Sequence, residues 1–399
     1  MKLCISLGKF ELKYFFYCTL FIVLEICIYY FTYFEEETLI DKNPLMHSFC
    51  FFLGYLLNFI PTLISHIKEK EKPIINKLKE EDNNNSIEYI YNMPYEKYLS
   101  IKDILKFFFI CLFLLIADLI ERFDNLFENK NNDNKFSDEF TFIEFLIFFL
   151  VSKFDKEAYY KHQYISFFIF ILIDVIKNIY FFSKNLYRSS IIIIIILNII
   201  DSILTSIYYL YIKHFMKYKF ISPAKCNFMI GIINVPTIIL IYFIISFTPL
   251  GNKNDNKYYN YNIFELFKQI GNIDVKNMIF LILLPFAYGI FHYILTKIIY
   301  DYTIFHIYIP FIVENFINSI FYSFGNNERI FLISSFFIEL IMILIFLEII
   351  EINCCGLNEN LKRNIQSRGI IDSSLAIEND DNDEFDDEKN NTIISTTKY

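Results

Sequence analysis

The segment "SSIIIIIILNIIDSILTSIYYLYIKHF" spans residues 189–215 and is long and apolar enough to cross a membrane as an α-helix. A spanning helix needs roughly 20 predominantly apolar residues. The segment shows no alternation of apolar and polar residues, which a barrel strand would require. It carries one charged residue near its middle, Asp201. It therefore predicts a spanning helix with a carboxylate at its centre.

Blocks of the same kind recur along the 399-residue chain, of which 55% is hydrophobic. Grouping into blocks of this length favours a membrane bundle over a soluble core. The fold class we expect is therefore an all-α membrane protein with ten transmembrane helices. Their expected ranges are 12–34, 46–66, 103–121, 138–155, 162–182, 189–212, 226–248, 277–299, 302–323 and 329–350.

Part of the composition carries little functional information. Ile, Phe, Tyr, Asn and Lys are abundant and Trp is absent, which is typical of an AT-biased coding sequence. Runs such as Ile191–Ile196 and Asn83–Asn85 are therefore interpreted as drift.

Lysine placement predicts the orientation. Lys and Arg are enriched in cytoplasmic connections. With a cytosolic N-terminus, the inside connections would hold the larger number of lysines, among them Lys68, Lys70, Lys153, Lys156 and Lys217, whereas the first outside loop, "FEEETLIDKN", is acidic. We therefore expect both termini in the cytosol of an integral protein of an endomembrane (Golgi, ER or vacuole) or of the plasma membrane.

The region after the last helix differs from the rest. The stretch "ENDDNDEFDDE", Glu378–Glu388, is too polar to bury apolar surface, and it accounts for most of the net charge of −9. Two interpretations of this stretch remain: a regulatory or sorting tail, and a solvated disordered end without such a role. Cys354 and Cys355 follow the last helix on the expected cytosolic side, where juxtamembrane cysteines are often palmitoylated.

The sequence contains no motif of a soluble enzyme. It lacks phosphate-binding glycine loops, a zinc-protease motif and a nucleophile elbow, and its other cysteines show no C-x-x-C pairing. We expect no enzyme activity, no cofactor and no metal. The expected partners are a small-molecule solute, membrane lipid and a second copy of the chain in a homodimer, and not nucleic acid.

An internal repeat relates the two halves. "NPLMHSFCFFLGYLLNFIPTLI", residues 43–64, resembles "SPAKCNFMIGIINVPTIILI", residues 222–241. The aligned pairs are Pro44 with Pro223, Gly54 with Gly231, Asn58 with Asn234, and Pro61 with Pro236. We expect helix breaks near Gly54, Pro61, Gly231 and Pro236. Five helices per half place the second copy upside down, as in an inverted-repeat transporter.

The chain resembles the drug/metabolite transporter superfamily. The resemblance rests on "LVSKFDKEAYYKHQYISFFIFILIDVIKNI" (residues 150–179), on "IKHFMKYKFISPAKCNFMIGIINV" (residues 212–235) and on the five-plus-five hydropathy pattern. It implies two inverted five-helix repeats, 1–182 and 183–351, followed by an acidic cytosolic tail, 352–399. It also implies a solute cavity lined by helices 1 to 4 and 6 to 9.

Ionisable residues inside the expected helices are candidates for a substrate or proton site, because a charge at the bilayer centre costs about 3 kcal/mol. Glu25 and Asp201 are central and related by the repeat. The other candidates are Asp118, Glu144, His292 and Glu314. Each acid could instead hydrogen-bond a neighbouring helix, and His292 could be a proton relay or an interhelical contact. Asp174 and Glu339 are expected to be peripheral, with Asp174 and Lys177 forming a local pair.

The sign of these residues bears on the substrate. Anions such as nucleotide sugars need Lys or Arg in the cavity, and none lies deep in helices 1 to 4 or 6 to 9. We therefore expect an alternating-access transporter for a cationic or neutral small solute, with proton coupling as an option. The alternatives are a membrane-embedded acyltransferase and a non-transporting structural membrane protein.

Overall fold

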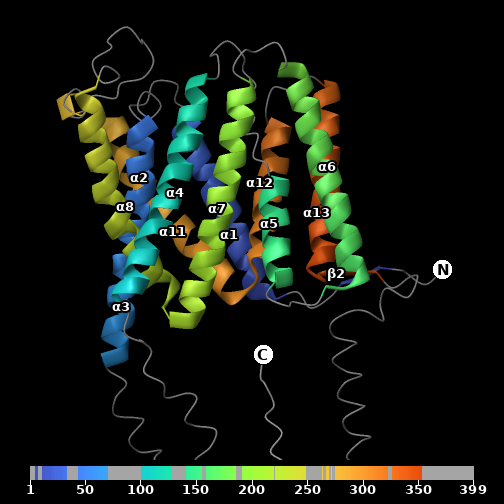
Figure 1. Ribbon diagram of the computed structural model, residues 1–399, viewed down its shortest axis with the longest axis horizontal. Helices are drawn as coiled ribbons and strands as arrows, with labels where there is room; N and C mark the ends of the chain where they lie inside the picture. The colour runs from blue at the N-terminus through green and yellow to red at the C-terminus, as the bar shows by residue number, and fades with distance from the viewer. Residues whose placement is uncertain are drawn as a thin grey trace, which may run out of the picture.

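The computed structural model describes residues 5–7, 11–33, 44–70, 100–127, 141–154, 159–185, 191–219, 221–248, 275–321 and 326–352, together with 263, 267–268 and 271. In this part of the chain it is a bundle of long, roughly parallel and antiparallel helices (Figure 1). The acidic tail, Cys354 and Cys355 lie outside the described residues.

Helices occupy all ten blocks that the sequence predicts. In the first half they are α1 (Leu12–Tyr33), α2 (Pro44–Leu57), α3 (Phe59–Lys70), α4 (Ile101–Phe127), α5 (Thr141–Phe154) and α6 (Lys161–Asn185). In the second half they are α7 (Ile191–Lys219), α8 (Pro223–Ser246), α11 (Val275–Asp301), α12 (Tyr308–Phe321) with the preceding short 3-10 helix η3 (Ile304–Ile307), and α13 (Asn326–Phe346). The helices α2 and α3 together fill one predicted block, so the prediction of an all-helical bundle is confirmed, whereas the crossing of a membrane by all ten segments stays a prediction.

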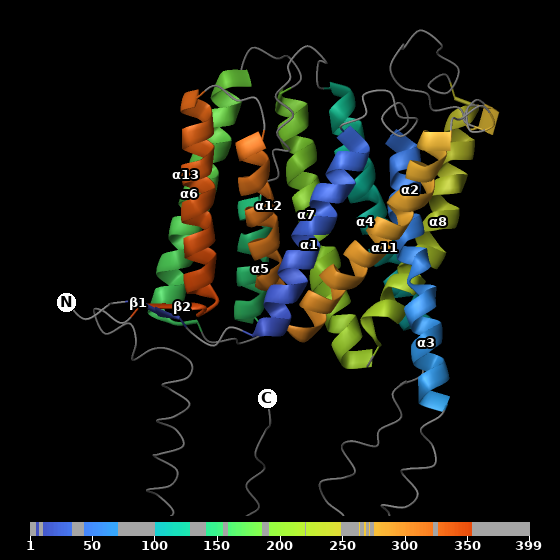
Figure 2. The same cartoon turned by 180° about the vertical axis from the view of Figure 1, so that it is seen from behind.

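The segment before the first helix and the segment after the last described helix pair in a small sheet. Strand β1 (Ile5–Leu7) pairs antiparallel with β2 (Ile350–Ile352). Since β1 precedes α1 and β2 follows α13, α1 starts and α13 stops at the same end of the bundle, called here the sheet end (Figure 2). Successive helical segments alternate in direction, so that α1, α4 and α6 lead away from the sheet end while α7, α11 and α13 lead back to it (Figures 1 and 2). Helices α4, α5, α6 and α7 lie on the face toward the viewer in Figure 1, and α1, α11, α12 and α13 lie on the face toward the viewer in Figure 2.

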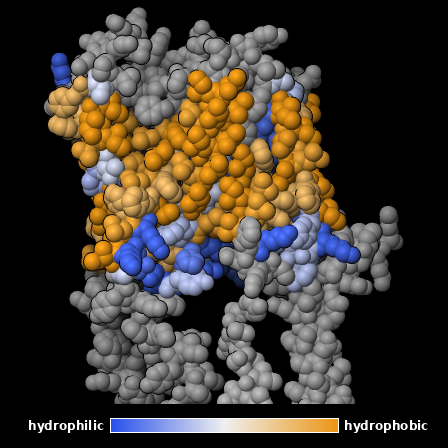
Figure 3. Space-filling model, viewed as in Figure 1, coloured by the Kyte–Doolittle hydropathy of each residue, from blue (hydrophilic) through white to orange (hydrophobic). Residues whose placement is uncertain are grey.

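The surface of the bundle is that of a membrane protein. Figure 3 shows a broad apolar belt over the middle of the helices and hydrophilic residues at the sheet end. Six described helices are long and apolar enough to cross a membrane. Their approximate spans are Leu45–Ile64, Lys161–Tyr180, Ile192–Lys219, Pro223–Ser246, Met278–Asp301 and Glu328–Phe346. The chain is therefore an integral membrane protein by the length and apolarity of its helices.

Basic residues are distributed unevenly between the two ends. The described helix turns at the sheet end hold Lys13, Lys68, Lys70, Lys102, Lys106, Lys153, Lys161, Lys217, Lys219, Lys225 and Lys297. The described residues at the opposite end include fewer, namely Lys184, Lys268, Lys276 and Arg329. Several of the lysines at the sheet end form ion pairs there, such as Lys219 with Asp103 at 2.7 Å and Lys13 with Asp301 at 2.8 Å.

The helices of the two halves pack against one another in a regular way. Helix α1 contacts α11 and α12, and α7 contacts α4 and α5. Helix α2 contacts α8 and α11, while α8 also contacts α4. Helix α6 contacts α13. Every helix described above therefore has a neighbour from the other half of the chain, α3 through its contact with α8.

Glycines allow the closest helix contacts. A Cβ added to Gly54 on α2 would lie 2.5 Å from Tyr288 Cβ and 2.8 Å from the backbone nitrogen of Gly289 on α11. A Cβ added to Gly231 on α8 would overlap the backbone of Leu56 on α2. Small residues let helices in a membrane approach to backbone contact. The two glycines that the repeat aligns therefore both serve to pack α2 against a helix of the second half.

The helix break predicted near Pro61 is present between α2 and α3. The second block is interrupted at Asn58, in the turn before Pro61, which has no N–H to donate to a preceding carbonyl. The Asn58 side-chain nitrogen donates to the carbonyl oxygens of Gly54, at 3.2 Å, and of Gly289, at 3.1 Å. It thereby satisfies polar backbone at the crossing of α2 and α11.

The predicted break at Gly231 and Pro236 is wrong, because α8 is continuous from Pro223 to Ser246. A proline is tolerated inside a membrane helix when neighbouring helices hold the segment in place. Helix α8 is packed along α2 and contacts α4 and α11 as well. Gly231 is therefore a packing position and not a hinge.

The contact at Gly231 gives a stability prediction. Gly231→Ala should force α8 and α2 apart, and overpacking of this kind costs about 1–3 kcal/mol. Gly271→Ala is the matched control, since a Cβ there meets nothing within 4 Å. Thermal unfolding of the detergent-solubilised full chain, followed by circular dichroism, should show a lower midpoint for Gly231→Ala only. Equal midpoints for the two variants would contradict the close contact.

Candidate functional site

A cavity of about 220 Å³ lies inside the bundle. Its walls come from α1, α2, α4, α5, α6, α7, α11, α12 and α13, so both halves of the chain contribute. Five of its 23 described lining residues are acids, one is a lysine and one is a histidine. The cavity is therefore a charged space within an apolar belt, which is the combination that marks solute or ion pathways in membrane proteins.

Most of the site residues predicted from the sequence line this one cavity. Glu25 on α1, Asp118 on α4, Glu144 on α5 and Asp201 on α7 all contribute to its wall. Glu25, Glu144 and Asp201 are half-buried and Asp118 is buried. Asp201 can occupy the centre of an apolar helix because its side chain faces this cavity and not lipid.

Glu314 is the predicted candidate that the structure does not bring to the cavity. It is half-buried on α12, while its neighbour Asn315 belongs to the cavity wall together with Phe311 and Ile312. Glu314 therefore lies on the same helix as part of the site but outside its lining.

Glu144 is linked to the second half by a hydrogen bond. The Tyr308 hydroxyl on α12 donates to Glu144 Oε2 at 3.3 Å, and both residues line the cavity. The same tyrosine is packed in a cluster of rings, since its centroid lies 5.3 Å from that of Phe145 on α5. Aromatic packing therefore fixes the donor that holds the Glu144 carboxylate.

His292 is held among aromatic rings between α2 and α11. Its ring stacks on Tyr55 with a centroid distance of 3.6 Å and an interplanar angle of 13°. It lies edge-on to Phe51 at 4.4 Å, and its Nε2 is 3.2 Å from the Phe51 carbonyl oxygen. Of the two roles considered for His292, this geometry favours the interhelical contact, although the residue also faces the cavity.

The contact of His292 extends to a third helix. Thr296, one turn further along α11, donates its hydroxyl to the His292 carbonyl oxygen at 2.7 Å and lies 2.8 Å from Asn227 Oδ1 on α8. On the other side, the Tyr55 hydroxyl is 3.4 Å from that of Tyr208 on α7. Polar side chains thus connect α2, α7, α8 and α11 behind one wall of the cavity.

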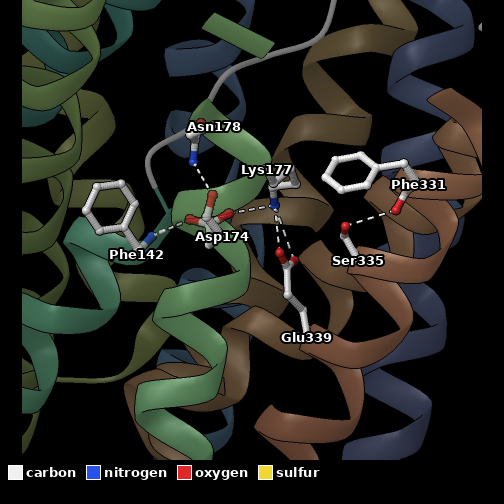
Figure 4. Close-up of polar contacts among 7 residues, drawn as sticks. All are labelled: Phe142, Asp174, Lys177, Asn178, Phe331, Ser335 and Glu339. Carbon is white, nitrogen blue, oxygen red and sulfur yellow. Dashed lines mark hydrogen bonds and ion pairs between the residues drawn. The ribbon is translucent and has the colours of Figure 1, made fainter. Parts of the chain in front are cut away.

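A buried ion triad forms the opposite wall. Lys177 Nζ on α6 lies 2.6 Å from Asp174 Oδ1, one turn earlier, and 2.9 Å from Glu339 Oε1 on α13 (Figure 4). All three side chains are buried, and Lys177 and Glu339 line the cavity. Asp174 also accepts a hydrogen bond from the Phe142 backbone N–H at 2.8 Å.

The triad confirms one expectation and corrects another. Asp174 and Lys177 do form the local pair expected from their spacing. The expectation that Glu339 is peripheral is wrong, because it pairs with Lys177 across α6 and α13 and faces the cavity. A lysine on the fifth helical segment and an acid on the tenth were both visible in the sequence, but their separation of 162 residues hides the pairing.

Comparison with known proteins adds no relative. No protein-family model and no curated protein matches this sequence. The functional argument therefore rests on the geometry of the cavity.

The triad gives a second stability prediction. Lys177→Met would leave two buried carboxylates side by side without their cation, which should cost about 3–5 kcal/mol of unfolding free energy. Glu339→Gln keeps the shape of the side chain and the Asp174–Lys177 pair, so its cost should be about 1 kcal/mol. Denaturant titration of the purified chain in mixed micelles measures both values. An equal loss of unfolding free energy in Glu339→Gln and Lys177→Met would contradict the view that Lys177 neutralises both carboxylates.

Proposed function

We propose that the protein is a multi-pass membrane carrier that moves a small cationic solute by alternating access. The observation that carries the proposal is the cavity at the meeting point of the halves, with acids from both of them. Glu25, Asp118 and Glu144 come from the first half, and Asp201 and Glu339 from the second. Carboxylates facing an internal cavity suit a cation, because they replace part of the water that the cation loses there.

The pattern of helix packing supports an inverted repeat. If the first to fifth helical segments are exchanged with the sixth to tenth, the contact of α1 with α11 becomes that of α7 with α4. In the same way the contact of α1 with α12 becomes that of α7 with α5, and that of α2 with α11 becomes that of α8 with α4. The pairs α2–α8 and α6–α13 map onto themselves, as pairs on a two-fold axis would. This is the arrangement expected of an inverted-repeat carrier such as those of the drug/metabolite transporter superfamily.

The distribution of lysines supports an orientation. The sheet end, with β1 and β2, is the end where the described basic residues gather. Basic residues are enriched on the cytoplasmic side of membrane proteins. The proposal therefore places the sheet end, with the start of α1 and the end of α13, in the cytosol.

Transport assays test the proposal. The full chain, reconstituted in vesicles, is screened for uptake of a panel of cationic, neutral and anionic solutes with and without a pH gradient. Asp201→Asn and Glu25→Gln keep side-chain size but remove a charge, and a charged hydrogen bond is worth about 1.5–3 kcal/mol. We expect each to lower uptake of the transported cation by about 10- to 100-fold.

Glu314→Gln is the matched control for these variants. It removes an acid from the same bundle at a position outside the cavity lining and should leave uptake unchanged. Uptake that is equal in Asp201→Asn, Glu25→Gln and the unaltered chain would refute a site at these carboxylates. An absence of uptake for every solute would leave a structural or enzymatic role for the bundle.

A further inference from the structure

We propose that the cavity contains two ammonium subsites, one filled by the protein's own Lys177 and the other open to an organic ammonium ligand. The inference rests on the proposed function and names the chemical class of its solute. Three features of the cavity carry it: its aromatic lining, its size, and the surroundings of Lys177.

The lining is richer in aromatic rings than the chain as a whole. Eight of the 23 described lining residues are Phe or Tyr, about a third, whereas aromatic residues make up 20% of the sequence. Aromatic faces attract alkylated ammonium groups, whereas inorganic cations such as Mg²⁺ and Ca²⁺ prefer oxygen ligands. Rings combined with carboxylates therefore favour an organic cation.

The size of the cavity limits the ligand. The volume of the cavity is about 220 Å³. Pockets for drug-sized ligands occupy about 300–1,000 Å³. In this conformation the cavity therefore favours a compact ion over a drug-sized solute.

Lys177 shows how the cavity holds an alkylammonium. Its Nζ lies 4.6 Å from the centroid of the Phe336 ring and 2.9 Å from the Glu339 carboxylate. Asp174 completes its surroundings at 2.6 Å. An aromatic face and carboxylates around a buried primary ammonium are the contacts that a free amine would need at the same place. We call this position the lysine subsite.

The same two chemical groups recur elsewhere in the cavity wall. Glu25 and Asp201 come from α1 and α7, which lie between the α6–α13 pair and the α2–α8 pair (Figures 1 and 2). Rings on α7, α11 and α12, among them Tyr209, Phe291 and Phe311, line the cavity with them. This region provides the second subsite, for a ligand that is not tethered to the chain.

Binding to the purified full chain tests the open subsite apart from transport. Tetramethylammonium, choline and propylammonium are each titrated against thermal unfolding, beside uncharged isosteres (3,3-dimethyl-1-butanol for choline, for example) and potassium chloride. We expect a saturable rise in midpoint with at least one ammonium and about tenfold or more weaker binding of its isostere. An isostere that binds as well as its ammonium, or no saturable effect of any of the three, would overturn the inference.

A second experiment tests the lysine subsite by chemical rescue. Lys177→Ala removes the tethered ammonium and leaves space beside Glu339 and Phe336. Propylammonium should raise the unfolding midpoint of this variant more than that of the unaltered chain, and propanol should not. Lys153→Ala, an exposed lysine at the end of α5, is the control and should show no added response. An equal response of Lys177→Ala and the control would overturn the subsite.

If Lys177→Ala does not fold, the diamine putrescine provides the measurement. The quantity measured is the ratio of putrescine affinity to choline affinity. In Asp174→Asn/Lys177→Ala, where one carboxylate of the lysine subsite remains, this ratio should be at least about tenfold higher than in the unaltered chain. An unchanged ratio would overturn the subsite. Ammonium binding without uptake would refute only the carrier function, and uptake of another cation without ammonium binding would refute only this inference.

Discussion

The structure depends on the cost of holding charged side chains inside a bundle that is surrounded by an apolar belt. A charge at the centre of a membrane must face protein or water, since lipid provides no compensating group. Six described acids of the helix interiors meet this requirement in two ways. Asp174 and Glu339 share a buried lysine, and Glu25, Asp118, Glu144 and Asp201 face a common cavity. The cavity and the triad thus answer the same constraint at adjacent places.

Close helix packing makes this arrangement possible. In a membrane there is no hydrophobic force between helices, so van der Waals contact and interhelical hydrogen bonds hold them together. Gly54 and Gly231 bring α2 to backbone contact with α11 and α8, and Asn58 bonds to the carbonyl oxygens exposed at the first crossing. The stack of His292 on Tyr55 continues the same contact toward the cavity. One wall of the site is therefore fixed by the contact that orders the helices.

Much of the fold could be predicted from the sequence, because the membrane sets the length of every helix. The ten predicted blocks all contain helices, and the largest departures are extensions such as the end of α4 at Phe127, beyond the predicted residue 121. The break at Asn58 lies between Gly54 and Pro61, two of the positions near which the repeat predicts a break. The break predicted at Pro236 does not occur, because the helices packed against α8 keep it helical. Those contacts come from distant parts of the chain and cannot be inferred from the residues around Pro236.

The site was predictable only in part. A carboxylate in an apolar helix identifies itself by its cost, and that reasoning found Glu25, Asp118, Glu144 and Asp201. It could not decide which side of a helix faces the cavity. Consecutive residues differ by about 100° around a helix, so Asn315 faces the cavity and Glu314 does not. The partnership of Lys177 with Glu339 depends on the adjacency of α6 and α13, which becomes known only with the fold.

Two contacts between the halves, α2–α8 and α6–α13, differ in the motion they allow. At α2–α8 the halves touch through the backbone of Leu56 at Gly231, where a displacement of less than one ångström would open a gap or produce a clash. At α6–α13 they touch through the long side chain of Lys177, which has several rotatable bonds and two carboxylates to choose from. A flexible cation can keep a partner while its helix moves, whereas a glycine contact cannot. If the halves rock in the proposed transport cycle, the α2–α8 contact is therefore the natural pivot and the α6–α13 pair the place of larger displacement. On this argument the triad would both neutralise buried charge and let one edge of the cavity move.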